Sequence, residues 1–222
     1  HVVGWPADPR AADFDGRALF NGVLGTQHPS DGSKLYYVPL ASGYWKLFGA
    51  PLHDFWCCTG SGSESFAKLG DSIYWHDEDG IYVNLFVPSE VEWRERGVRI
   101  VQETRFPEQA TTTLAIRAPK ATAFTLRIRV PAWTLHGGSA RLNGKPLERF
   151  SEPGSYFALT RTWKDGDRVE VTLPMGLHTH PMPDYPSLQA IMSGPPALVG
   201  RMGPEGPPPG NERSSTPRHS SH

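Results

Sequence analysis

Cysteine, net charge and long apolar runs are all scarce in this chain of 222 residues. Its two cysteines, Cys57 and Cys58, are adjacent, unlike the spaced disulfide frameworks of small secreted domains. A formal net charge of −1, with Lys and Arg spread along the chain, offers no basic stripe for a nucleic-acid backbone. No apolar run approaches the roughly 20 residues that cross a bilayer, and residues 1–10 lack the pattern of a signal peptide. We expect neither nucleic acid nor a membrane as a partner, and the compartment stays open.

Residues 111–174 alternate between apolar and polar with a period of two. In the clearest run, Phe124–Val130, the four apolar side chains would share one face of a half-buried antiparallel strand. Between such runs lie turn signals such as Asn143-Gly144, a pair that favours hairpin turns.

A further hairpin is predicted around the turn Asp77-Glu-Asp-Gly80, between runs at Ile73–Trp75 and Ile81–Val87. Many short strands at regular spacing favour a β-sandwich over a parallel sheet. The predicted fold class is therefore mostly β, with a C-terminal β-sandwich over residues 72–202.

Residues 1–71 differ, because they combine a short amphipathic stretch at about 13–24 with a loop-rich aromatic segment, as at the end of a helical domain. A helix is predicted from Gly62 to Leu69, with Ser61 as N-cap and Glu64 completing a capping box. Residues 203–222 are rich in Pro, Gly and Ser and are expected to be disordered.

The strongest chemical signal is the segment Phe55–Glu64, in which Cys57 and Cys58 stand in a Gly/Ser-rich loop ahead of the predicted helix. Free N–H groups and the helix dipole at such a position favour thiolate over thiol. A thiolate can serve as a nucleophile or as a zinc ligand. From spacing alone, an equally good interpretation is that both cysteines are small buried apolar residues.

Other candidate sites are weaker. His178 and His180 could bind a metal from one face of a strand, but no third ligand is identifiable, and no histidine is indicated as the base of a cysteine protease. The carboxylates of residues 77–79 are better explained by turn formation than by glycoside hydrolysis. Aromatic residues can stack on sugars or fill a core, so only those of residues 36–56 are retained as site candidates.

Five segments of the chain together carry a resemblance to a known family. They are Arg17–Leu24, Tyr36–Leu40, Phe55–Gly60, Lys68–Tyr74 and Gly80–Ser89, and their most specific parts are the Cys-Cys-Thr-Gly motif and the Tyr-Val-Asn-Leu-Phe run. These segments resemble the bacterial β-L-arabinofuranosidases of glycoside hydrolase families 127 and 146, with a loop closer in style to family 146. The similarity covers about residues 13–200.

The resemblance implies an (α/α)6 barrel followed by β-sandwich modules, so that residues 1–71 would be the end of the barrel and carry the nucleophile loop. It also implies a retaining mechanism in which a zinc-bound cysteine thiolate attacks the anomeric carbon. Carried over, Cys57 is the expected nucleophile and a zinc ligand, Cys58 a second zinc ligand, and Tyr37 a substrate contact. The implied substrates are arabinose-containing plant polysaccharides or glycoprotein oligosaccharides.

The chain departs from the family pattern in one respect that bears on activity. The family holds zinc with a glutamate and three cysteines, two of these ligands in an upstream Glu-x-Cys motif, with an acid/base glutamate further upstream. This sequence has neither a third cysteine nor Glu-x-Cys. We therefore expect a C-terminal fragment with an incomplete zinc site and no turnover of its own.

Two alternatives remain open from the sequence. One is a non-catalytic carbohydrate-binding β-sandwich, suggested by Arg141–Lys145 and by aromatic residues that look exposed. The other is a thiol protease or redox protein, although adjacent cysteines make a strained ring on oxidation.

Overall fold

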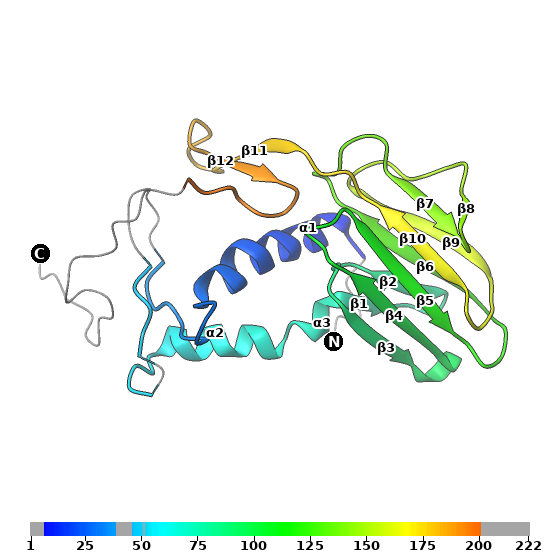
Figure 1. The fold of residues 1–222 in the computed structure, drawn as a ribbon, viewed down its shortest axis with the longest axis horizontal. Helices are drawn as coiled ribbons and strands as arrows, with labels where there is room; N and C mark the ends of the chain where they lie inside the picture. The colour runs from blue at the N-terminus through cyan, green and yellow to red at the C-terminus, as the bar shows by residue number, and fades with distance from the viewer. Residues whose placement is uncertain (1–6, 39–45, 51, 201–222) are drawn as a thin grey trace, which may run out of the picture. The chain divides into compact units, whose positions relative to one another are not determined.

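The structure is a computed structural model that describes residues 7–38, 46–50 and 52–200. The chain divides into two compact units, one of residues 1–17 and 70–198 and the other of residues 18–69 and 199–222. Strands account for more of the described chain than helices do, and the named strands all belong to the first unit (Figure 1). The predicted tail, residues 203–222, lies outside the described residues.

Two sheets of the first unit form a β-sandwich (Figure 1). The four-stranded sheet has the order β1 (Tyr74–His76), β2 (Gly80–Val83), β6 (Thr122–Val130) and β9 (Ser155–Trp163). The six-stranded sheet has the order β3 (Ser89–Trp93), β4 (Val98–Thr104), β5 (Thr111–Arg117), β10 (Arg168–Thr172), β7 (Ser139–Leu142) and β8 (Lys145–Pro146). A separate hairpin pairs β11 (Leu177–Pro181) with β12 (Gln189–Ser193). The predicted fold class is confirmed.

Aromatic side chains fill the space between the two large sheets. The ring of Trp93 on β3 lies 5.7 Å from that of Phe124 on β6, which in turn stacks at 5.5 Å on Trp163 of β9. All three residues are buried. These aromatics belong to the core, where ring contacts add to the free energy of apolar burial, and they are not available to stack on a sugar.

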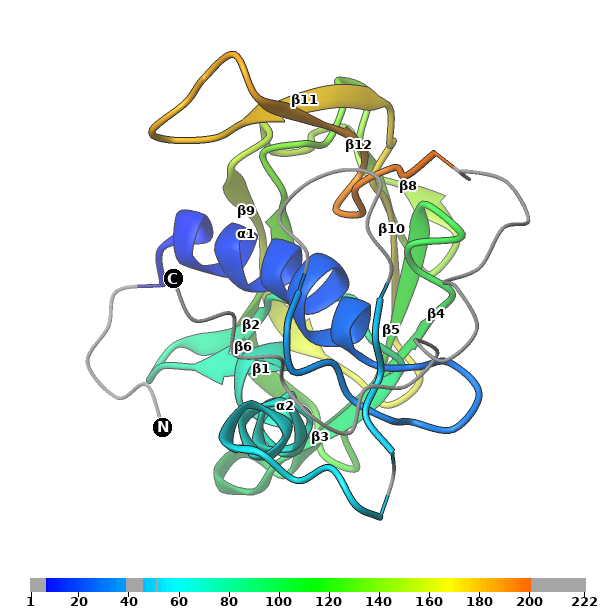
Figure 2. The same cartoon turned by 90° about the vertical axis from the view of Figure 1, so that its left-hand side faces the viewer.

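Strand β6 is buried more completely than its alternating pattern predicts. Its four apolar side chains face the core as expected, but Arg129 on the opposite face is only 3% exposed. Helix α1 (Pro9–Arg17) lies along that face, beside β2 and β6 (Figure 2). The strand pairs parallel with β2 and antiparallel with β9, so the prediction of a half-buried antiparallel strand was only partly right.

The predicted hairpin of β1 and β2 is present but shorter than expected. The carboxylate of Asp77 accepts hydrogen bonds from the N–H groups of Asp79 and Gly80, at 3.0 and 2.7 Å, so this acidic segment forms a turn, as predicted. Strand β2 ends at Val83, whereas the sequence pattern predicted a strand to Val87. The tight approach of β2 to β6 requires Gly80, because a Cβ there would lie 2.1 Å from the Thr125 carbonyl oxygen.

The second unit holds the π-helical segment η1 (Ala18–Val23), the 3-10 turn η2 (Leu24–Thr26) and helix α2 (Cys57–Ala67). Two further short helices, α3 (Gly70–Ile73) and the 3-10 turn η3 (Arg94–Arg96), belong to the first unit. Across the described ranges, none of the helices is both long and apolar enough to span a bilayer.

Candidate active site

Helix α2 begins at the two cysteines themselves. The predicted start at Gly62 was wrong, because the helix runs from Cys57 to Ala67 with Trp56 as an N-cap whose side chain makes no capping bond. Ser61 does not cap it, and its hydroxyl donates to the Cys57 carbonyl oxygen at 3.3 Å. The N–H groups of the first turn therefore lie beside the thiols, at the positive end of the helix dipole.

The predicted capping-box glutamate serves another purpose. Glu64 pairs with Lys68 one turn later, at 2.7 Å, on the exposed surface of α2. This pair lies near the C-terminal end of the helix, where the positive charge of Lys68 also complements the helix dipole. It contributes little to the site itself, because solvent screens an ion pair this exposed.

Both thiols are free and exposed, so the alternative interpretation of Cys57 and Cys58 as small buried apolar residues was wrong. The two sulfur atoms lie 3.8 Å apart, and the hydroxyl oxygen of Tyr36 lies 3.8 Å from the Cys57 sulfur. The hydrogen bond from Tyr36 lowers the pKa of Cys57, with further contributions from Cys58 and from the N–H groups of the two cysteines. The hydrogen bond between the two thiols, which lowers the pKa of Cys57, raises that of Cys58. The two neighbours therefore differ in chemistry: Cys57 is the thiol that ionises more readily.

The tyrosine beside the sulfur is Tyr36, for which we predicted no specific role. Tyr37, predicted as a substrate contact, is 65% exposed, and its ring packs edge-on against Tyr36 at 4.5 Å. Tyr36 also meets the Trp56 ring at 5.2 Å, just before the thiols. No local signal distinguishes the two tyrosines, because only the path of the chain decides which of them faces α2. The remaining aromatic candidates, Tyr44 and Trp45, lie outside the described residues.

Lys34 connects the tyrosine segment to the helix. Its ammonium nitrogen lies 3.6 Å from the centre of the Phe66 ring on α2, a favourable cation–π geometry. Partial burial there lowers the pKa of Lys34. The Lys34 carbonyl oxygen also accepts a hydrogen bond from the N–H of Gly49, and the adjacent Leu35 forms a β-bridge with Phe48. Tyr36 thus follows directly on two residues that are held in place by these contacts.

A buried carboxylate holds the turn that leads from Gly49 to Asp54, just before Trp56. Asp54, 7% exposed, accepts a hydrogen bond of 2.6 Å from the N–H of Ala50. A Cβ at Gly49 would lie 3.0 Å from the Asp54 Cβ, so the absence of a side chain there allows this packing. The turn thereby sets the approach of the chain to Trp56 and to the first residue of α2.

The described residues do not by themselves make a complete zinc site. Zinc in proteins takes four ligands in a tetrahedral arrangement, and Cys57 and Cys58 supply two sulfur atoms close enough together to bind one ion. Within the described ranges, no group of three or more His, Cys, Asp or Glu side chains is arranged to hold a metal. The donor chemistry suits zinc, but the number of donors does not.

The other sequence candidates have structural explanations. His178 and His180 lie on β11, as predicted, but burial and the nearby Arg17 lower the pKa of His180, and no described third ligand accompanies them. The segment Arg141–Lys145 forms the turn between β7 and β8, with Asn143 and Gly144 both at positive φ, 51° and 78°. The Asn143 side chain donates to Asp167 and accepts from the N–H of Arg168, so this side chain is already engaged within the turn.

Comparison with known families identifies both parts of the chain. A family model described as the GH127 catalytic domain of β-L-arabinofuranosidase matches residues 1–71, and one described as the GH127 middle domain matches residues 80–175. Together they cover the thiol segment and most of the sandwich. The chain belongs to glycoside hydrolase family 127.

Solved structures of this family have the same fold. The chain is similar to a GH127 β-L-arabinofuranosidase from Geobacillus stearothermophilus T6, at 28% identity and a TM-score of 0.72, over 86% of this chain and 33% of that one. It is also similar to a second GH127 β-arabinofuranosidase, at 25% identity and a TM-score of 0.70, again over 86% of this chain and 33% of that one. A third structure, described as a glycoside hydrolase, shares the fold at 22% identity and a TM-score of 0.71. The chain thus spans about a third of the length of these relatives, and a search of curated proteins found no match.

Proposed function

We propose that Cys57 is the nucleophile of a retaining β-L-arabinofuranosidase of family 127. The single observation that supports this most is the placement of its exposed sulfur, at the start of α2 and within hydrogen-bond distance of the Tyr36 hydroxyl. Both features stabilise negative charge on sulfur, and a thiolate is the reactive form of cysteine. The names of the related enzymes suggest arabinofuranosides as the substrate class.

In the proposed reaction, the Cys57 sulfur forms a bond to the anomeric carbon while the glycosidic C–O bond breaks. The leaving oxygen takes a proton from an acid, and a water molecule then releases the sugar from sulfur and restores the thiolate, with net retention. Tyr36 donates its hydroxyl hydrogen to the sulfur when that atom is anionic. We expect the acid to lie outside the described residues, because no described carboxylate hydrogen-bonds either thiol or Tyr36.

We further propose that Cys57 and Cys58 are two ligands of a zinc ion whose other ligands also come from outside the described residues. When bound, zinc would keep both thiols deprotonated at neutral pH. Since two thiolates alone hold the ion weakly, the 222-residue chain by itself is expected neither to retain zinc through dialysis nor to release arabinose. Zinc-dependent release of arabinose by the purified chain would contradict this part of the proposal.

A covalent probe tests the nucleophile directly. The chain is incubated with an arabinofuranose-configured cyclophellitol epoxide, and the modified residue is located by peptide mass spectrometry. One adduct on Cys57 is expected, absent in Cys57→Ser and retained in Cys58→Ser. Labelling of Cys58 to the same extent, or equal labelling by the epoxide of the mirror-image sugar, would show that exposure and not recognition directs the reaction.

A further inference from the structure

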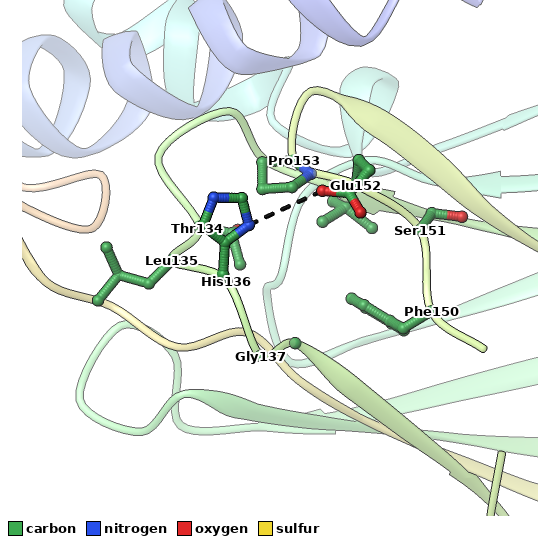
Figure 3. A pocket seen from close by; sticks show the side chains of 10 residues that line it. Thr134, Leu135, His136, Gly137, Phe150, Ser151, Glu152 and Pro153 are labelled. Atoms are coloured by element: carbon green, nitrogen blue, oxygen red, sulfur yellow. Dashed lines mark ion pairs between the residues drawn. The ribbon is translucent and has the colours of Figure 1, made fainter. Parts of the chain in front are cut away.

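A small pocket in the β-sandwich unit is formed by the loop after β6 and the segment before β9. It has a volume of about 80 Å³ and is open to solvent. Figure 3 shows the side chains that define it, with His136 and Glu152 on one side and the Phe150 ring on the other. Since one water molecule needs about 10–15 Å³ of such space, the pocket can hold several waters or the edge of a small ring.

The pocket wall carries a buried hydroxyl with no partner among the described residues. Thr134 is 5% exposed, and its Oγ1 atom is buried without a hydrogen bond. A buried hydroxyl that lacks a partner costs free energy, so a ligand or water that reached it would recover a hydrogen bond. Thr134 is one of the residues that line the pocket, so its hydroxyl is a candidate hydrogen-bonding group for an occupant.

The two charged groups at the rim are free to turn toward a ligand. The His136 Nδ1 and Glu152 Oε2 atoms lie 3.8 Å apart, and the side chains are 93% and 83% exposed. An ion pair this exposed contributes little to stability. The imidazole can therefore donate and the carboxylate accept hydrogen bonds at the mouth of the pocket without loss to the fold.

The aromatic wall is fixed by the local backbone. A Cβ at Gly138 would lie 2.5 Å from Cε1 of Phe150, so only glycine leaves room for the ring. Gly137, at a φ of 95°, allows the loop to turn at this point. Phe150 also packs against the buried Phe157 at 4.8 Å, which holds the ring in place from the core side.

From this combination, we propose that the pocket receives the edge of one sugar ring of a glycan, with the apolar face of that ring against Phe150. Its hydroxyl groups would contact Thr134 at the back and Glu152 and His136 at the rim. An aromatic face with a few convergent polar groups is the usual chemistry of small hydroxylated ligands. That the ring is an arabinofuranose rests on the proposed function, whereas the pocket chemistry itself indicates only a sugar.

The test is an NMR titration of the ¹⁵N-labelled full chain with methyl β-L-arabinofuranoside. Saturable amide shifts are expected at residues 134–138 and 150–152. Thr134→Val and Glu152→Gln should each weaken binding roughly fivefold, the effect of one net hydrogen bond. Glu148→Gln, an exposed glutamate beside the pocket segment, should bind as the parent chain does.

Three results would overturn the proposal: no saturable shift in these loops, equal binding by Thr134→Val, or equal binding of glycerol, which would mean an adventitious polyol only. Folding is not in question for Thr134→Val, since the change removes an unpartnered hydroxyl, and its melting temperature is measured in parallel. If the sugar still binds to Cys57→Ala and the epoxide forms no adduct on the parent chain, the proposal that Cys57 is the nucleophile fails and the proposed sugar site stands. If the epoxide labels Cys57 but the pocket residues show no saturable shift, only the proposed sugar site fails.

Discussion

Asp13 of α1 and Arg129 of β6, separated by 116 positions in the sequence, form a buried ion pair. The Asp13 carboxylate also accepts a hydrogen bond of 3.1 Å from the N–H of Ala132, and the Arg129 Nε donates to the Asn84 carbonyl oxygen at 2.6 Å. The pair therefore fixes α1, the end of β6 and the chain after β2 to one another. Burial of both charges makes each depend on the other.

Removing one partner of this pair should strongly destabilise the β-sandwich unit. Arg129→Met leaves a buried carboxylate without its cation and should lower the free energy of unfolding by about 3–5 kcal/mol, measured by urea denaturation. The double variant Asp13→Leu/Arg129→Met should recover much of the loss, because no charge remains buried. Arg127→Met is the matched control: its pair with Asp77 is partly exposed, so the change should stay below about 1 kcal/mol. If Arg129→Met and Arg127→Met lowered the free energy of unfolding equally, the Asp13–Arg129 pair would not be the critical buried interaction.

The thiols of Cys57 and Cys58 should ionise at different pH. The pKa of Cys57 is lowered, chiefly by the Tyr36 hydroxyl, and that of Cys58 is raised. Because only the thiolate is alkylated, the pH profile of iodoacetamide labelling should have its midpoint at lower pH for Cys57 than for Cys58, as read by mass spectrometry of each peptide.

Tyrosine variants identify the cause of this difference. Tyr36→Phe removes the hydrogen bond to sulfur and should move the Cys57 midpoint toward higher pH. Tyr37→Phe, the same change one residue along the chain, should leave it in place, since the described contacts of the Cys57 sulfur are with Tyr36 and Cys58. A shift of similar size in both variants would mean that the hydroxyl of Tyr36 is not the main cause.

The structure explains why some sequence predictions succeeded and others failed. Alternation predicted the core face of Phe124–Val130, because burial of one face imposes a period of two. It could not predict that Arg129 on the other face is covered, since Asp13 lies in a distant part of the chain. The fold class could therefore be predicted, but the burial of the second face could not.

The same distinction holds at the candidate site. The sequence drew attention to the thiols and to a nearby helix, but the helix start was predicted at Gly62 because Ser61 and Glu64 match a capping box. Helix α2 instead begins earlier, with Phe66 against Lys34. Which of Tyr36 and Tyr37 lies beside the Cys57 sulfur depends on this tertiary arrangement, so the local sequence could not predict it.

Two glycines in different backbone conformations should respond oppositely to alanine. Gly144 has a φ of 78° in the turn between β7 and β8, where a Cβ costs about 1–2 kcal/mol, so Gly144→Ala should lower the melting temperature. Gly60 lies within α2, with open space where a Cβ would project, and Gly60→Ala should stabilise that helix by about 0.5–1 kcal/mol. Hydrogen exchange of α2 amides reads the second effect locally; faster exchange in Gly60→Ala would contradict the helical assignment.

A buried glutamine explains why β2 ends early and provides the last test. Gln102 on β4 is 2% exposed, and its Nε2 atom donates to the carbonyl oxygens of Leu85 and Val87, at 2.9 and 2.7 Å. These backbone groups thus bind a side chain where a longer β2 would have used strand pairing. Gln102→Leu leaves both acceptors unpaired at a cost of about 1–3 kcal/mol each, partly offset because it also removes Oε1, which is buried without a partner. The free energy of unfolding should therefore fall by about 1–3 kcal/mol in urea denaturation. The same change at the exposed Gln109 should have almost no effect. If Gln102→Leu unfolds at the same urea concentration as the parent chain, residues 84–87 are held by some other interaction, and the side chain of Gln102 does not determine the end of β2.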